Sequence, residues 1–460
     1  TDLFWILNSY LLMLAALIIV GGSLGDKLGR VKVFAIGIGI FTIGSALCGL
    51  SPDIQYLIAF RTIQGIGGAL MIPGSLAIIS ATFNKEERGK AIGTWSAATT
   101  IVTICGPVLG GALADMGLWR FIFYINVPLG IVCLITLFTK VPESREMGAS
   151  KVDWLGAAVL VLSLALLTFG FLEMPELGYT HPVVVANLAI GFVLLLAFIF
   201  IERKVKHPMI PLELFQNKTF AGVNLLSFFL YAALGAIMLF LSLNIIQIQG
   251  YSQFQAGLTF LPFTFLMIIV ARRMGALTDK YGARRFLVVG PIITGLGMCW
   301  LASIGMTAGP AAYWTTYFPG FVVFALGMSI TVVPLTTAVM TSVHDDKSGI
   351  ASGINNSVTR IAGTFINAIL GAVAIYIFTD FVMEAIEGVA LTDSIKTELL
   401  EELVKLGEAE APSALMGKQR EQVDQLLDTA FVATYQWVGF LSAGLAFLAA
   451  LIAFFMVSKK

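Results

Sequence analysis

Two arginines stand in the middle of long apolar stretches of this 460-residue chain, Arg61 and Arg360. A lone arginine at the centre of a bilayer costs roughly 2.5–3.5 kcal/mol on insertion scales, so something must compensate each of them. Either the guanidinium faces a polar cavity, where it responds to the charge of a proton or ligand, or it hydrogen-bonds backbone carbonyls of a neighbouring helix. Both interpretations stay open. Gln64, one turn after Arg61, is a further candidate for the same coupling role.

Other polar side chains also fall inside apolar stretches. An apolar cavity with a few polar groups suits amphipathic organic molecules. Each of these side chains can equally serve as a hydrogen bond between helices. The candidates for a cavity are Asn8, Tyr10, Thr99, Thr103, Asn224, Gln247, Asn355 and Asn356.

A short polar sequence, Gly-x-Leu-x-Asp-Lys-x-Gly, occurs twice at an offset of 253 residues. Its glycines allow a tight turn, and its aspartate and neighbouring bases can form a charged latch that favours one of two conformations. A plain connecting turn is the alternative, but the charge pattern is kept in both copies. The same offset superposes Gly37 on Gly290 and Gly44 on Gly297, which indicates a duplicated chain. The predicted switch residues are Gly22, Asp26, Gly29 and Arg30 in the first copy and Asp279, Gly282 and Arg284 in the second.

A third motif combines a proline with glycines. Gly106-Pro107 removes a backbone hydrogen bond and kinks a helix, while Gly110 and Gly111 let another helix approach closely. We expect a hinge or seal near the outer face. Glycine-rich packing without a role in gating is the alternative.

These residues must be positioned by membrane helices. The chain is 58% hydrophobic and 12% charged, against about 25% charged in an ordinary soluble domain. Thirteen apolar stretches are each long enough to cross a bilayer, for which roughly 20 residues suffice. The sequence therefore predicts an all-α membrane protein with 13 spans.

Lysine and arginine cluster in alternate loops, such as 27–32 and 203–206, and these loops are cytoplasmic by the positive-inside rule. Residue 1 is then extracytoplasmic and residue 460 cytoplasmic, in a multi-pass protein of the cell membrane. A duplicated chain with an odd number of spans is expected to lack an original first span. The acidic residues of the spans lie only near span ends, at Asp2, Asp26, Asp115, Glu173, Glu202, Asp279 and Asp380.

The duplication divides the chain into two predicted bundles, 1–150 and 212–460, joined by an inserted transmembrane hairpin with its connectors at 151–211. Parallel repeats of this kind belong to transporters that rock about a site at the bilayer midplane. Residues 380–428 are expected to form a solvated, acidic extracytoplasmic loop. Within it, 392–406 is predicted to be an amphipathic helix that lies on the bundle surface or docks a partner.

Several motifs resemble the major facilitator superfamily. The duplicated latch resembles its signature loop, the stretch from Arg61 to Ala69 its arginine motif, and Gly106 to Gly111 its antiporter motif. The stretch from Trp119 to Pro128, the residues from Gln249 to Gly257 and the inserted hairpin resemble the fourteen-span drug:proton antiporter family. The resemblance implies two pseudo-symmetric bundles. It also implies a first helix with an intramembrane aspartate, without which residues 1–460 are expected not to couple transport to protons.

The resemblance implies a secondary transporter that exports lipophilic or cationic organic compounds in exchange for protons. Export of an endogenous metabolite, such as a siderophore, lipid precursor or amino-acid derivative, is the alternative, and a non-transporting sensor is a weaker one. The expected partners of the protein are a small-molecule substrate, protons and the lipid bilayer, and an accessory export protein is left open. The zero net charge and scattered bases argue against nucleic-acid binding. No ATP-binding loop, cofactor site, metal site or enzymatic activity is expected, and the four cysteines are expected to be packing residues.

Overall fold

The computed structural model describes residues 2–83, 106–144, 153–205, 210–343, 348–386 and 391–458, together with residues 95, 98, 102 and 208. Every regular element in these residues is a helix, which confirms the predicted all-α class. Eleven helical segments are long and apolar enough to cross a membrane, and Trp5–Ile18 adds a shorter one. These match twelve of the thirteen predicted stretches. Of the remaining stretch, residues 95, 98, 102 and 106–115 are described as helical.

The first set of helices comprises α1 (Asp2–Leu28), α2 (Arg30–Leu50), α3 (Ile54–Thr82), the helix 106–115, α5 (Phe121–Tyr124) and α6 (Asn126–Lys140). We call these the N-terminal helices, and we call the end at which α1 begins the outer end, following the predicted orientation. Asp53 starts α3 there because its carboxylate accepts the backbone N–H groups of Gln55 and Tyr56 at 3.0 and 3.1 Å. The opposite, inner end is where α1 meets α2.

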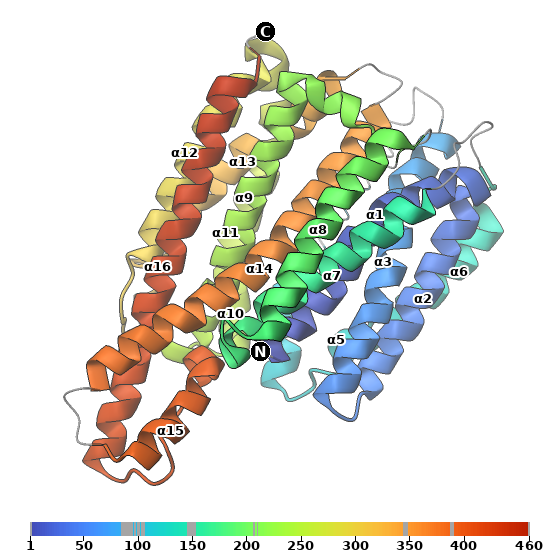
Figure 1. Ribbon diagram of the computed structural model, residues 1–460. Helices are drawn as coiled ribbons and strands as arrows, with labels where there is room; N and C mark the ends of the chain where they lie inside the picture. Colours follow the sequence, from blue (N-terminus) through green and yellow to red (C-terminus); the bar gives the residue numbers. More distant parts are fainter. Residues whose placement is uncertain are drawn as a thin grey trace.

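The C-terminal helices are α9 (Lys218–Leu243), α10 (Gln253–Thr259), α11 (Leu261–Tyr281), α12 (Ala283–Ala302), α13 (Tyr317–Thr341), α14 (Ser348–Ile386) and α16 (Lys418–Met456). A π-helical turn, η2 (Asn244–Ile248), ends α9 at the outer end. Figure 1 shows the two sets side by side, with the two chain termini at opposite ends of the molecule.

Glycines at matched positions pack both sets in the same way. A Cβ added at Gly44 of α2 would lie 2.9 Å from the backbone nitrogen of Gln64 in α3. At Gly297, its counterpart in α12, the added Cβ would lie 2.4 Å from the backbone nitrogen of Phe324 in α13. Both helix pairs therefore depend on close backbone approach. The duplication seen in the sequence is repeated in this packing.

The inserted hairpin consists of α7 (Trp154–Leu177) and α8 (Pro182–Lys204). Its buried residues Leu160, Leu164 and Phe198 form one apolar cluster with Leu12 and Ala16 of α1, and Ile361 and Phe365 of α14 pack against that cluster. The indole of Trp5 also donates to the Glu173 carboxylate at 3.3 Å. The hairpin thus contacts both sets of helices rather than standing apart in the lipid (Figure 1).

The acidic segment 380–428 is not the solvated loop expected from its composition. Residues up to Ile386 continue α14, and α16 already begins at Lys418. Between them, α15 (Asp393–Glu402) and η5 (Leu403–Glu408) confirm the predicted amphipathic helix near 392–406. Its apolar face is buried, with Leu399, Leu403 and Leu406 at most 3% exposed in the same core cluster as Phe431 of α16. The charges face outward while this face extends the core, and Figure 1 shows α15 beyond the outer end of the bundle.

Candidate functional site

Arg61 lies on α3, half-buried against α1. Its Cζ atom stands 4.4 Å from the centre of the Tyr10 ring, and its Nε donates to the carbonyl of Ile6 at 3.3 Å. Its Nη1 donates to the side-chain oxygen of Gln64 at 2.7 Å. The carbonyl of Ile6 therefore offsets part of the cost of placing the Arg61 guanidinium inside the span, as one of the two interpretations expected. Among the described residues Nη2 makes no hydrogen bond, so one edge of the fork stays available.

A chain of buried and half-buried hydrogen bonds holds Gln64. Its amide nitrogen donates to the Ser45 hydroxyl at 3.1 Å, and Asn126 donates to the same oxygen at 3.0 Å. Ser45 in turn donates to the carbonyl of Phe123 at 2.8 Å. These contacts join α2, α3, α5 and α6, and they fix the amide that orients Arg61. Neither Ser45 nor Asn126 was expected from the sequence to be part of a site. The only signal was the place of Asn126 in the stretch that resembles the family.

Arg360 approaches the same region from the C-terminal helices. Its side chain on α14 is exposed, as is that of Asn356 one turn earlier. Next to it on α14, Ile361 and Phe365 pack against the apolar cluster that contains Leu12 and Ala16 of α1, the helix that also carries Tyr10. Each set of helices therefore contributes one arginine to the region where α1 meets α14. We call Tyr10, Arg61, Gln64 and Arg360 the central site.

The two sets of helices meet directly at the outer end. A Cβ added at Gly111 would lie 2.2 Å from the carbonyl oxygen of Gln253, and one at Gly257 would lie 2.4 Å from the carbonyl oxygen of Pro107. The helix 106–115 and α10 thus touch backbone to backbone. At Gly106 and Gly110 an added Cβ meets no atom of the described residues within 4 Å, whereas Gly111 and Pro107 make the contacts of the seal that the structure describes.

Asp115 adds a polar contact to this outer closure. Its carboxylate accepts the backbone N–H groups of Gln253 and Phe254, the first residues of α10, at 2.8 and 2.9 Å. The residue is exposed at the end of its helix, next to the loop Met116–Arg120. Hydrogen bonds from the Ser252 hydroxyl and then from these backbone groups hold the pKa of the Asp115 carboxyl below its usual value. An acid of one set of helices therefore caps a helix of the other.

The duplicated latch forms the predicted tight turns at the inner end. Gly29 between α1 and α2 has a φ of 115°, and Gly282 between α11 and α12 has a φ of 79°. Only glycine adopts such angles without strain, so both copies need it. The side chains of Asp26 and Asp279 lie outside the described part of the structure, while Gly22 lies on α1 close to Pro73 of α3.

Each latch turn is held by residues at the end of its own set of helices, just after α6 in the first copy and near the end of α16 in the second. Glu143, just after α6, accepts the backbone N–H groups of Val31 and Lys32, both at 3.0 Å, and the N–H of Arg30 donates to Ser144 at 2.8 Å. In the second copy Arg284 donates to the carbonyl of Phe454 near the end of α16 and lies over its ring. Sequence reasoning missed Glu143, because its partner lies more than 100 residues away.

The other cavity candidates separate into distinct roles. Asn355 donates to Asn224 at 3.1 Å and to Ser227 at 2.7 Å, so the two asparagines link α14 to α9 inside the C-terminal helices. Gln247 lies at the outer end, where it donates to Glu408 of η5 at 3.0 Å and not into the central site. Asn8 is fully buried on α1. Thr99 and Thr103 lie outside the described residues.

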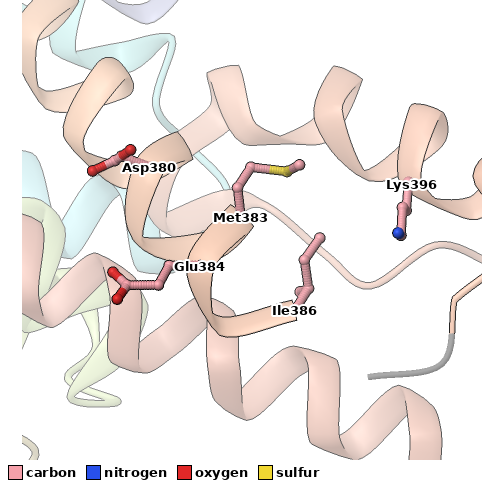
Figure 2. A pocket seen from close by; sticks show the side chains of 5 residues that line it. All are labelled: Asp380, Met383, Glu384, Ile386 and Lys396. Atoms are coloured by element: carbon pink, nitrogen blue, oxygen red, sulfur yellow. The ribbon is translucent and has the colours of Figure 1, made fainter. Parts of the chain in front are cut away.

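An open pocket of about 420 Å³ lies at the outer end, apart from the central site. Asp380, Met383, Glu384 and Ile386 of α14 line it together with Lys396 of α15. Figure 2 shows Asp380 and Glu384 on the same side of α14, with Lys396 across the pocket. Its walls belong to the end of α14 and the acidic segment, so it opens outward and contains neither arginine of the central site.

Comparison with known proteins agrees with this arrangement. A family model described as Major Facilitator Superfamily matches residues 1–367. The chain belongs to the major facilitator superfamily. It is 33% identical to the multidrug resistance protein Stp of Mycobacterium tuberculosis over 80% of this chain and 68% of that protein. It is 27% identical to the tetracenomycin C resistance and export protein of Streptomyces glaucescens over 99% of this chain and 84% of that one.

Solved transporter structures share the fold. An auto-inhibited peptide transporter of the POT family aligns with a TM-score of 0.66 at 15% identity, covering 99% of this chain and 88% of that one. The nucleoside transporter NupG aligns with a TM-score of 0.56 at 13% identity, covering 100% of this chain and 91% of that one. The protein is thus a membrane transporter of the major facilitator type, with multidrug-resistance relatives, and not an enzyme.

Proposed function

We propose that this protein exports lipophilic organic compounds from the cell, in exchange for protons, by alternating access. Two sets of helices rock about the central site, so that it opens first to one side of the membrane and then to the other. The motifs of the latch and of the outer seal change partners between the two states. Arg61 couples the occupant of the central site to this movement through Gln64 and Tyr10.

The outer closure carries the proposal. Among the described residues, Gly111 and Gly257 bring the two sets of helices into backbone contact at the outer end, and the central site lies deeper along α1, α3 and α14. A site that is shut at one end by a contact between two movable units is what alternating access requires. The multidrug resistance and export proteins among the relatives support organic compounds as the cargo. Protons are proposed as the driving ion because the sequence motifs resemble those of drug:proton antiporters.

The test is transport by the full-length protein in liposomes with an imposed pH gradient. Neutral, cationic and anionic aromatic dyes serve as probes, and dye movement is followed with the gradient and after its collapse by an ionophore. We expect at least one dye to move against its concentration gradient only while the pH gradient lasts. Arg61→Ala should abolish that movement, whereas Arg120→Gln, which removes a base from an outer loop, should not. Movement that is indifferent to the pH gradient would rule out proton exchange.

A further inference from the structure

The acidic segment 380–428 contacts the turn that leads into the outer seal. We propose that Glu408 and Gln247 are positioning residues, through which this segment holds α10 against the helix 106–115 and stabilises the outer-closed state. The inference rests on the proposed alternating access, because it names a contact that is released when the outer end opens. It gives a role in transport to a segment that lies apart from the central site.

The contact is made by η5. Glu408 accepts a hydrogen bond from Nε2 of Gln247 in η2 at 3.0 Å. Gly407 lies against the same amide, because a Cβ added there would collide with Oε1 of Gln247 and would lie 3.3 Å from the ring of Phe431 in α16. Gly407 thus packs between η2 and α16, and a side chain at this position would displace the Gln247 amide from Glu408.

The backbone beside this contact is strained. Leu406 has a φ of 57° and a ψ of −121°, and it is the one non-glycine residue with a positive φ in the part of the chain that the structure describes. Such a conformation is costly for a residue with a Cβ and persists only where the surroundings hold it. The Leu406 side chain is buried in the core cluster, which offsets the cost. The strained turn brings Gly407 and Glu408 against η2.

The seal helix α10 is a short segment between two breaks. Before it, α9 ends in the π-helical turn η2, and Gly250 follows with a φ of 70°. After it, α11 begins at Leu261 with a proline in its first turn. A π-helical turn interrupts the regular hydrogen-bond ladder of a helix, and proline cannot continue one. α10 can therefore change its tilt without a movement of the whole of α9 or α11.

The contact at Gln247 lies close to the seal along the chain. Gln253, six residues later, is the residue whose backbone meets Asp115 and Gly111. A displacement of η2 therefore shifts the seal. Gln249 also fixes this stretch through hydrogen bonds to Gly305 and Thr307, so loss of the contact with Glu408 should weaken the closed state without abolishing it.

The test uses the full-length protein in lipid nanodiscs, with spin labels at Tyr56 and Trp314 on a cysteine-free background. Both positions are exposed, and they belong to different sets of helices, so the distance between the labels reports the outer end. The pH is set where the parent protein shows both a short and a long distance. Thermal unfolding of each variant shows whether it is folded.

Four variants separate the contact from a general effect of charge. Glu408→Ala and Gln247→Ala should each lower the ratio of outer-closed to outer-open molecules by about 2- to 10-fold, the net worth of one hydrogen bond. The double variant should lower it no further, because both changes remove the same contact. Glu408→Gln keeps an acceptor for Gln247 and should restore most of the closed population. Glu402→Ala removes a carboxylate of the same segment that pairs with Lys405 at 2.6 Å, and it should leave the ratio unchanged.

The outcomes separate this inference from the proposed function. A lower unfolding temperature without a change in the ratio, or an equal shift in Glu402→Ala, overturns the positioning role even if gradient-driven transport is found. A shift confined to changes at Gln247 and Glu408 supports the role even if no dye moves in the pH gradient, and in that case the export proposal alone fails. A single outer distance at every pH, in parent and variants alike, overturns both.

Discussion

The outer seal makes a sharp prediction at two adjacent glycines. Gly110 and Gly111 lie on the same helix, but only Gly111 faces the C-terminal helices. An alanine Cβ at 111 would lie 2.2 Å from the carbonyl oxygen and 2.7 Å from the carbonyl carbon of Gln253. These are backbone atoms that cannot rotate away. An alanine Cβ at 110 would meet no atom within 4 Å in the part of the chain that the structure describes.

The size of the effect follows from this overlap. Forcing a methyl group into a packed contact costs typically about 1–3 kcal/mol. Here the chain can escape the cost by separating the two sets of helices at the outer end, so the penalty falls on the closed state alone. The ratio of outer-closed to outer-open molecules should then fall by about 5- to 150-fold for Gly111→Ala. Gly257→Ala, 2.4 Å from the carbonyl oxygen of Pro107, should act in the same direction.

The ratio can be measured by distances between spin labels across the outer end, on a cysteine-free background with labels at Tyr56 and Trp314. Both positions are exposed and belong to different sets of helices. Because one separation relieves both clashes, Gly111→Ala with Gly257→Ala should shift the ratio by less than the product of the single effects. Equal distance distributions for Gly110→Ala and Gly111→Ala, in folded protein, would refute the backbone contact.

Three further changes test other parts of the structure. Asp115→Ala should open the outer end more than Asp115→Asn, because asparagine keeps one hydrogen-bond acceptor. The closed state lowers the pKa of Asp115, so the outer end of the wild type should open as the outside pH falls through that lowered pKa, and an equal pH response in Asp115→Ala would refute this. Ser45→Ala leaves Gln64 and Asn126 without their shared acceptor, so the free energy of unfolding should fall by about 1–3 kcal/mol and substrate affinity should fall with it, as thermal unfolding and calorimetry would show. In the acidic segment Leu403→Ala should cost about 2–5 kcal/mol of stability, whereas Leu400→Ala on its exposed face should cost little, and equal unfolding temperatures would contradict the buried face.

Features set by local chemistry could be predicted from the sequence. The turns at Gly29 and Gly282 follow from glycine at matched positions, and the helix near 392–406 follows from the spacing of its leucines. Span positions follow from hydrophobic length alone. These features depend on neighbours within a few residues, so a single sequence contains them.

Contacts between distant segments could not be predicted in this way. Asn355 and Asn356 are adjacent and chemically identical, yet Asn355 donates a hydrogen bond to Asn224 of α9, whereas Asn356 lies on the exposed face with Arg360. Polarity alone does not distinguish them, because the rotation of α14 against its neighbours decides. Asp115 caps a helix that begins 138 residues later, and the burial of the acidic segment depends on α16.

The central claim is that the two sets of helices rock about the central site, and paired distances at both ends test it most directly. One label pair spans the outer end at Tyr56 and Trp314, and a second spans the inner end at Leu28 and Tyr281, which occupy equivalent places in the two copies of the latch. Both are measured in the full-length protein in lipid nanodiscs over a range of pH. We predict opposite changes, in which the outer distance grows in the same molecules whose inner distance shrinks. Distances that stay fixed, or that grow together at both ends, would contradict alternating access in this protein.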